Sequence, residues 1–210
     1  MEPVEITHNM ELIGAFLTGV VGPILYLLIN KFYQDHRERG RDKVKETVEQ
    51  TCIVEKELFA AREEFDADRV WIAQFHNGGN FYPTGKSIQK FTVFYEDNSP
   101  GIGKIAHTLN NIPCSLYPKA LSRLMTKQGI FISNFEFNDL DLYGLQPLSQ
   151  TTGTKSQYIL PLFSLDDKFI GMIGVDYVVE DYEMNKNDWE HFQIYGGRIA
   201  GFLSNYLKIY

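Results

Sequence analysis

An α+β fold is predicted, with an antiparallel sheet, flanking helices and one N-terminal transmembrane helix ahead of them. Residues 12–30 form an apolar run without a charged side chain. Runs rich in β-branched and aromatic residues fill the middle of the chain, and helix-forming segments frame them. Because helices and strands come in blocks rather than in strict alternation, we expect an antiparallel sheet with helices packed largely on one face.

The N-terminal region has the features of a membrane anchor. Residues 1–11 form a short acidic head, and residues 12–30, "LIGAFLTGVVGPILYLLIN", are long enough for an apolar helix to cross a bilayer. No Lys or Arg precedes this run. The basic residues that follow it are Lys31, Arg37, Arg39, Arg41, Lys43 and Lys45. The positive-inside rule therefore predicts a single-pass protein of the inner (cytoplasmic) membrane with its soluble domain in the cytoplasm.

The same segment carries small residues at a helical spacing. Gly14, Thr18 and Gly22 recur every four positions, which lets two membrane helices approach closely and favours a homodimer through the transmembrane and flanking helices. The alternatives are a buried core helix and a cleaved signal peptide. The acidic head and the lack of a small-residue cleavage site argue against cleavage.

Residues 31–43 form a basic juxtamembrane linker, interrupted by Gly40. The helix predicted for residues 44–67 is amphipathic, because strong helix formers run without Gly or Pro as far as Phe65 and the apolar positions fall near one face. We assign residues 44–210 to one soluble domain that includes this helix.

After Asp68 the pattern changes to strands. The runs "RVWIAQF" and "SIQKFTVFYE" are typical strands, and Asn77-Gly78-Gly79 is expected to end the first one and turn the chain. Two helices, "PGIGKIAHTLNNIPCS" and "YPKALSRLMTKQG", and a short strand, "IFISNF", are predicted next. The runs "SQYILPLFS" and "FIGMIGVDYV" predict a hairpin, and "NKNDWEHFQIYGGRIAGFLSNYLKIY" predicts a closing helix.

Composition and charge argue against several classes of protein. The 20 basic and 27 acidic side chains give a net charge of -7, and no basic cluster lies along an aromatic-rich strand, so we expect no nucleic-acid partner. Cys52 and Cys114 lack a CxxC spacing and the histidines are scattered, which argues against a metal site. A lone disulfide between the two cysteines is left open.

Three passages together resemble a GAF domain, and the resemblance covers most of residues 44–210. They are "ALSRLMTKQGIFISNF", "KSQYILPLFSLDDKFIGMIGVDYV" with its Pro161 and Gly171, and "NKNDWEHFQIYGGRIAGFLSNYL". The resemblance implies a GAF/PAS-like antiparallel sheet. It also implies a sensory role, dimerisation through the first and last helices, and small ligands held between the sheet and the middle helical segments.

The chain departs from the branches of this family whose ligand or activity is defined. Asn185-Lys186 stands without the Phe and the Asp-Glu pair of the cyclic-nucleotide binders, and Cys114-Ser115 lacks the histidine that follows the cysteine in many bilin binders. Two cysteines far apart in sequence do not match the branch that reduces free methionine sulfoxide. The sequence therefore leaves any cofactor unknown.

Candidate ligand contacts concentrate in "QFHNGGNFYPTGK". A histidine, backbone amides in a Gly-rich stretch and a lysine can hold an anion, while aromatic side chains can line a mostly apolar pocket. A carboxylate within an apolar strand needs a partner. The ligand-binding candidates are His76, Asn77, Gly78, Phe81, Tyr82, Lys86, Tyr95, Tyr117 and Asp176. For His76 and the aromatic residues, ordinary strand-end and core roles remain the alternatives.

The leading prediction is a membrane-anchored, non-enzymatic GAF-type module that recognises a small molecule or a protein partner. An acidic head, one span, a helix and a compact α+β domain also resemble in layout the large single-span holins of tailed phages, whose soluble domain lies in the periplasm. An enzyme that uses His76 and Asp176 for acid–base chemistry is a third hypothesis, disfavoured because no nucleophile or metal accompanies the pair.

Overall fold

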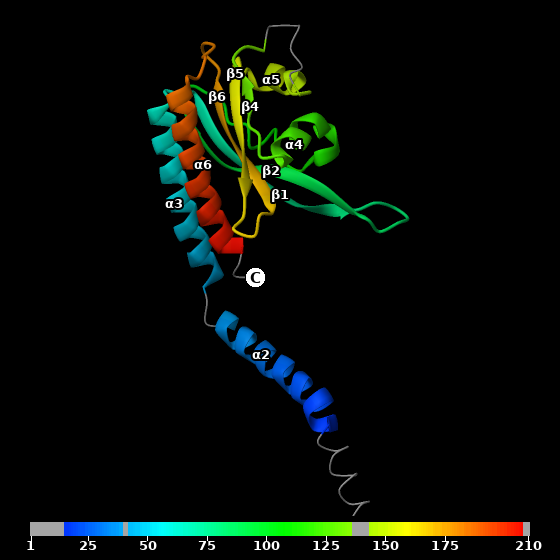
Figure 1. Cartoon of the computed structure of the whole chain (residues 1–210). Helices are drawn as coiled ribbons and strands as arrows, with labels where there is room; N and C mark the ends of the chain where they lie inside the picture. The colour runs from blue at the N-terminus through cyan, green and yellow to red at the C-terminus, as the bar shows by residue number, and fades with distance from the viewer. Residues whose placement is uncertain (1–14, 40–41, 136–142, 208–210) are drawn as a thin grey trace, which may run out of the picture. The chain divides into compact units, whose positions relative to one another are not determined.

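The computed structural model describes residues 15–39, 42–135 and 143–207 of the chain (Figure 1). These residues divide into two compact units, Met1–Val48 and Glu49–Tyr210. The predicted head and the start of the predicted span lie outside the described residues.

The first unit is helical. It contains a π-helical turn, η1 (Leu17–Val21), and helix α2 (Gly22–Arg39). Within the residues that the structure describes, no helix combines the length and the apolar character needed to cross a bilayer. The apolar run is divided between η1 and the first half of α2, and α2 carries charged residues from Lys31 onward.

The second unit is built on a six-stranded antiparallel sheet with the strand order β3-β2-β1-β6-β5-β4. The central pair are β1 and β6, so the first and last strands of the sequence lie side by side. The strands are β1 (Arg69–Asn80), β2 (Ser87–Asn98), β3 (Ile112–Pro113), β4 (Ile130–Ile132), β5 (Ser156–Phe163) and β6 (Phe169–Tyr177). This confirms the predicted antiparallel α+β architecture and the β5–β6 hairpin.

Helices cover both faces of the sheet. The long helices α3 (Lys43–Glu64) and α6 (Lys186–Leu207) lie against one face, and α4 (Pro118–Met125) and α5 (Gln146–Thr152) lie over the other (Figure 1). A short 3-10 turn, η2 (Cys114–Leu116), leads into α4. The expectation of helices largely on one face was therefore wrong, because the central strands are apolar on both sides and need cover on both.

Each face has its own apolar core. On the α3–α6 side, Leu58, Phe192 and Ile199 are fully buried. On the α4 side, Leu124 and Ile130 are fully buried around the same strands. Burying one side chain of this size contributes roughly 1.5–3 kcal/mol to folding, so the two layers together hold the sheet in place.

The helix predicted for residues 100–115 is not formed. The chain there makes turns, in which Gly101 (φ 89°) and Asn111 (φ 57°) adopt left-handed backbone conformations. The backbone N–H groups of Ile105 and Ala106 donate to the Glu96 carboxylate instead of to a helical carbonyl. A side-chain acceptor on β2 thus replaces the helical hydrogen bonds that the pattern predicted.

The Asn77-Gly78-Gly79 sequence does not turn the chain, which corrects the prediction. Strand β1 continues to Asn80, and the turn follows it. A Cβ on Gly78 would lie 2.2 Å from Cδ of Lys90, so glycine leaves room for the flexible lysine stem that crosses the strand at this point. The left-handed Gly79 (φ 98°) lies where the register between β1 and β2 shifts. These glycines shape a long hairpin and do not end it.

Candidate functional site

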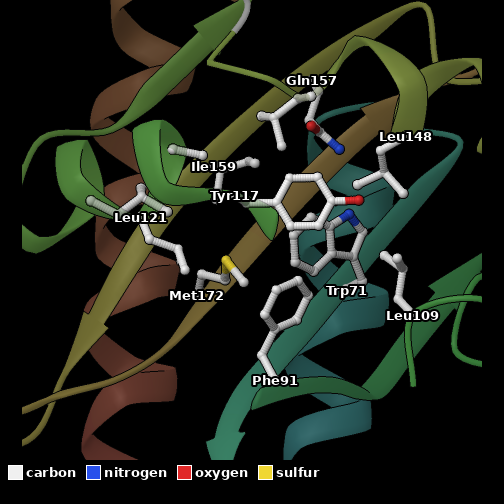
Figure 2. A pocket seen from close by; sticks show the side chains of 12 residues that line it. Trp71, Phe91, Leu109, Tyr117, Leu121, Leu148, Gln157, Ile159 and Met172 are labelled. Atoms are coloured by element: carbon white, nitrogen blue, oxygen red, sulfur yellow. The ribbon is translucent and has the colours of Figure 1, made fainter. Parts of the chain in front are cut away.

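The second unit encloses an apolar cavity between the sheet and helix α4. Figure 2 shows Tyr117 and Leu121 on one side of it and Trp71, Phe91 and Met172 on the other. The complete lining is Trp71, Phe91, Leu109, Tyr117, Ala120, Leu121, Leu124, Leu145, Leu148, Gln157, Ile159 and Met172. This is where the resemblance implied a ligand, between the sheet and the middle helical segments.

The open space in this cavity is small. It amounts to about 20 Å³, and a water molecule needs roughly 10–15 Å³ measured in the same way. The cavity as it stands therefore has room for about one water-sized group. A larger ligand would have to part the side chains that line it.

A buried polar network adjoins the cavity at its Trp71–Gln157 end. The Asp176 carboxylate accepts hydrogen bonds from Arg69 Nη1 (3.0 Å), Trp71 Nε1 (3.0 Å) and Gln157 Nε2 (2.8 Å), and Thr154 Oγ1 lies 3.5 Å away. Arg69 and Gln157 are the direct neighbours of Asp176 in the β1–β6 and β5–β6 registers. The sheet itself therefore sets the three side chains in one row.

The network contains an ion pair that is almost completely buried. Arg69 and Asp176 are each 1% exposed, and Arg69 Nη2 also donates to the backbone oxygen of Gly103. Burial raises the pKa of Asp176 above its ordinary value, while Arg69 and the hydrogen bonds from Gln157 and Trp71 act in the opposite direction. Arg69 Nε has no hydrogen-bond partner among the described residues. The carboxylate thus has its partners, whereas the guanidinium keeps one donor unused.

The predicted contacts in "QFHNGGNFYPTGK" lie away from the cavity, on the β1–β2 hairpin. His76 packs edge-on against Phe94, and its Nε2 lies 2.8 Å from Thr92 Oγ1. The amide oxygen of Asn77 accepts hydrogen bonds from Ser87 and Gln89 across the hairpin. None of the predicted residues in this stretch lines the cavity: His76, Asn77, Gly78, Phe81, Tyr82 and Lys86.

The remaining predicted residues fall into different layers. Tyr117 lines the cavity, and burial raises the pKa of its phenol. Asp176 is the centre of the adjoining network. Tyr95 packs against the core on the opposite face of the sheet, beside α3 and α6. The structure thus brings Tyr117 and Asp176 together at one site and separates Tyr95 from them.

Sequence reasoning missed Arg69, Trp71 and Gln157. Arg69 is the first residue of a strand, where an exposed side chain is expected, and Trp71 lies in an apolar run, where a core role is expected. A usable signal was present in Gln157 and Asp176, because a polar side chain inside each of two adjacent apolar strands of a predicted hairpin calls for a shared partner.

The two cysteines and the described histidines lie outside the cavity lining. Within the described residues no group of His, Cys, Asp and Glu side chains is arranged to hold a metal ion. Cys52 and Cys114 are both free, which closes the question of a disulfide between them. Burial raises the pKa of the Cys114 thiol, so it is held in its less reactive protonated form.

The described domain has the fold of GAF domains. No family model matches the sequence, and no curated protein matches it either. Among solved structures, the blue-light absorbing form of the PixJ GAF domain from Thermosynechococcus elongatus aligns with a TM-score of 0.61 at 13% identity, over 80% of this chain and 93% of that one. At this level of identity the likeness establishes the fold alone.

Two further neighbours are GAF domains of cyanobacterial phytochromes. The phycoerythrobilin-bound domain aligns with a TM-score of 0.60 at 16% identity, over 80% of this chain and 92% of that one. The phycocyanobilin-bound domain aligns with a TM-score of 0.59 at 16% identity, over 78% and 88% of the two chains. These neighbours share the fold with this chain, and nothing in them supports the holin-like alternative.

The residues present do not fit a bilin. Pockets for ligands of that size enclose about 300–1,000 Å³, whereas this cavity offers about 20 Å³. Cys114, which packs against the same core, has its thiol pKa raised by burial, the opposite of what covalent attachment needs. The fold is shared with these photoreceptor domains, but the cavity of this chain does not match a bilin in size.

Proposed function

We propose that this chain is a non-enzymatic GAF-type sensory or binding module that recognises a small molecule or a protein partner while attached to a membrane. The observation that carries the proposal is the enclosed apolar cavity between the sheet and α4, with the Arg69–Asp176 network at one end. Apolar walls with a few fixed polar groups are typical of ligand sites. The lining residues supply neither a nucleophile paired with a base nor metal ligands, which supports binding rather than catalysis.

The cavity favours a small and largely apolar ligand. Gln157 and Tyr117 are the polar side chains in its lining, and Gln157 already spends one amide hydrogen on Asp176. Tyr117 and Leu148 line the cavity but do not lie on the central strands β1 and β6. Displacing either side chain would therefore create space without breaking the sheet. A larger ligand needs such a movement, which would open the face of the Trp71 ring to it and free the Tyr117 hydroxyl to donate a hydrogen bond.

Native mass spectrometry of the full chain, purified in mild detergent, tests the ligand directly. We expect a small molecule to remain bound to the wild type. The Ala120→Val variant, whose two added methyl groups fill the cavity beside α4, should lose it. The matched control is Ala60→Val on the exposed part of α3, which should keep the ligand. An empty wild-type protein, or equal occupancy in both variants, would contradict the ligand-binding role.

Attachment to the inner (cytoplasmic) membrane is part of the same proposal. Large apolar side chains are exposed around the helical segment of the first unit, and they include Phe16 (59%), Leu27 (65%) and Phe32 (72%). A helix with apolar residues on all sides is stable only inside a protein or in lipid. The basic residues after Asn30 favour a cytoplasmic domain. Alkaline carbonate extraction and a reporter fused after Tyr210 test attachment and orientation separately.

We also propose a homodimer through the N-terminal segment and the helix pair α3–α6. In Figure 1, no described element of the second unit covers the outer side of this pair. Ile53 (44% exposed) and Ile194 (58% exposed) place apolar surface on the two helices. Substitution of both residues by Glu should abolish energy transfer between two labelled copies in vesicles. The matched control is Val179→Glu, at an exposed position outside both helices.

A further inference from the structure

The β1–β2 hairpin extends beyond the sheet. Strand β1 pairs with β6 only from Arg69 to Gln74, and β2 pairs with β3 only at Lys90 and Phe91. Residues 77–89, called the hairpin arm here, therefore pair only with each other, and Figure 1 shows the arm projecting from the rest of the domain. The hairpin arm therefore contributes neither to the apolar cores nor to the lining of the cavity.

The tip of the arm is held in a defined shape that presents two aromatic rings. The backbone N–H of Phe81 donates to the oxygen of Lys86, and the N–H of Gly85 donates to the oxygen of Phe81, both at 2.8 Å. Gly85 (φ 68°) supplies the left-handed residue of the turn. Phe81 is 52% exposed and Tyr82 is 97% exposed. A hydrogen-bonded turn thus holds two large rings in solvent, where their exposure is unfavourable.

The charge of the arm is opposite to that of the chain. The protein carries a net charge of -7, yet from Arg69 to Tyr95 there is no acidic residue. Lys86 follows the aromatic tip, and Lys90 lies at the base of the arm with its stem across Gly78. An anionic surface would repel most of this protein and would attract this element.

We propose that the hairpin arm inserts Phe81 and Tyr82 into the interfacial layer of an anionic bilayer, with Lys86 at the level of the lipid headgroups. Tyr with its polar tip and Phe are suited to that layer, and Lys gains from negative lipid charge. The inference rests in part on the proposed membrane attachment, because a tether supplies the high local concentration that so small a contact needs. The exposed apolar side chains of the first unit favour lipid over an acidic protein as the partner.

Depth-dependent fluorescence quenching tests the arm in the full chain reconstituted into vesicles. Tyr82→Trp places a reporter at the tip, and Leu165→Trp places one at another exposed hairpin turn, which is followed by Asp166 and Asp167. The wild type, with Trp71 and Trp189, gives the background. In vesicles of brominated phosphatidylcholine with phosphatidylglycerol, we expect loss of emission from position 82 and not from position 165.

The electrostatic contribution is tested separately. Without phosphatidylglycerol, or with Lys86→Glu added to Tyr82→Trp, quenching at position 82 should weaken, and the charge reversal should shift the equilibrium by about fivefold or more. Equal quenching in both lipid mixtures would overturn the anionic preference.

The outcomes separate this inference from the proposed function. If the chain floats with the vesicles while positions 82 and 165 are equally unquenched, the arm proposal fails and membrane attachment stands; an arm that binds an acidic protein would give this result. If the chain does not float at all, both the attachment and the arm contact are overturned.

Discussion

Arg69 and Asp176 face each other across the two central strands, with Nη1 3.0 Å from Oδ2 and both residues 1% exposed. Removing one partner leaves the other charge buried without compensation. We expect Asp176→Ala to lower the free energy of unfolding by about 3–5 kcal/mol. Urea titration of the full chain in detergent, followed by far-UV circular dichroism, measures this.

Two further variants show whether the cost comes from the unpaired charge. The exposed pair Lys186–Glu190 on helix α6 provides the control, since Glu190→Ala should change the unfolding free energy by less than about 1 kcal/mol. The double variant Arg69→Met with Asp176→Leu removes both charges, and it should cost less than Asp176→Ala alone. If the double variant is the least stable of the three, the hydrogen bonds of the network matter more than the ion pair.

Gly174 allows the Trp71 indole to lie flat against β6. A Cβ at position 174 would fall 2.2 Å from Cζ2 of Trp71, a rigid ring whose Nε1 is already bonded to Asp176. Gly174→Ala should therefore cost about 1–3 kcal/mol and shift the tryptophan emission. Gly197→Ala, where a Cβ meets nothing within 4 Å in helix α6, should instead stabilise the domain by about 0.5–1 kcal/mol.

Leu124 is fully buried and lines the cavity. Leu124→Ala should lower stability by about 2–5 kcal/mol and leave a larger dry space. Benzene or indole should then raise the melting temperature of this variant more than that of the wild type. Calorimetric scans with and without the ligand measure the difference. No change in either protein would mean that α4 collapses onto the sheet when the side chain is shortened.

Glu64 links the pH dependence of stability to the contact between α3 and α6. Its carboxylate accepts hydrogen bonds from Tyr195 Oη (2.8 Å) and pairs with His191 Nδ1 (2.7 Å). Chiefly because of the Tyr195 hydrogen bond and then the His191 contacts, the pKa of Glu64 is held below its ordinary value of 4.5. A lowered pKa contributes stability that is present above the unfolded-state pKa and is lost as the pH falls through the folded-state pKa.

We therefore expect Glu64→Gln to be less stable than the wild type at pH 7 by about 0–1 kcal/mol, because the group is partly exposed. The difference should shrink as the pH falls below 4.5. Denaturant titrations across this range test the sign. A difference that grows on acidification would show that the carboxylate is destabilised in the folded protein.

The two cysteines should differ sharply in reactivity. Cys52 is exposed on α3, whereas burial raises the pKa of Cys114. Maleimide at neutral pH should label Cys52 rapidly and Cys114 slowly. Mass spectrometry over time distinguishes them, and Cys52→Ser should remove the rapid phase. Rapid labelling of Cys114 in that variant would reopen the question of covalent ligand attachment there.

Much of the architecture could be predicted because periodic patterns report local structure. The β5–β6 hairpin and the closing helix followed from their apolar spacing. The missing helix at residues 100–115 could not be foreseen, because the Glu96 carboxylate that captures its N–H groups comes from a neighbouring strand. The turn predicted at Asn77-Gly78-Gly79 was wrong for a related reason, because the Lys90 stem that packs beside Gly78 comes from the other strand of the hairpin.

The site was predictable only in part. Tyr117 was predicted as one of several aromatic residues suited to an apolar pocket, and Asp176 because a carboxylate in an apolar strand needs a partner. Arg69 and Gln157 have meaning only through the β1–β6–β5 register, which brings them to either side of Asp176. A pairing between the first and last strands of the domain is a long-range property that no local pattern contains.

The small volume of the cavity determines how this domain would select a ligand. A domain with a large preformed cavity selects ligands by shape. A domain whose cavity is nearly filled selects them by the free energy needed to displace the lining side chains. Trp71 is tied to the ion pair and pressed against Gly174, so it resists displacement, whereas Tyr117 lies before a short helix. Discrimination between chemically similar ligands should therefore depend on how easily Tyr117 and helix α4 are displaced.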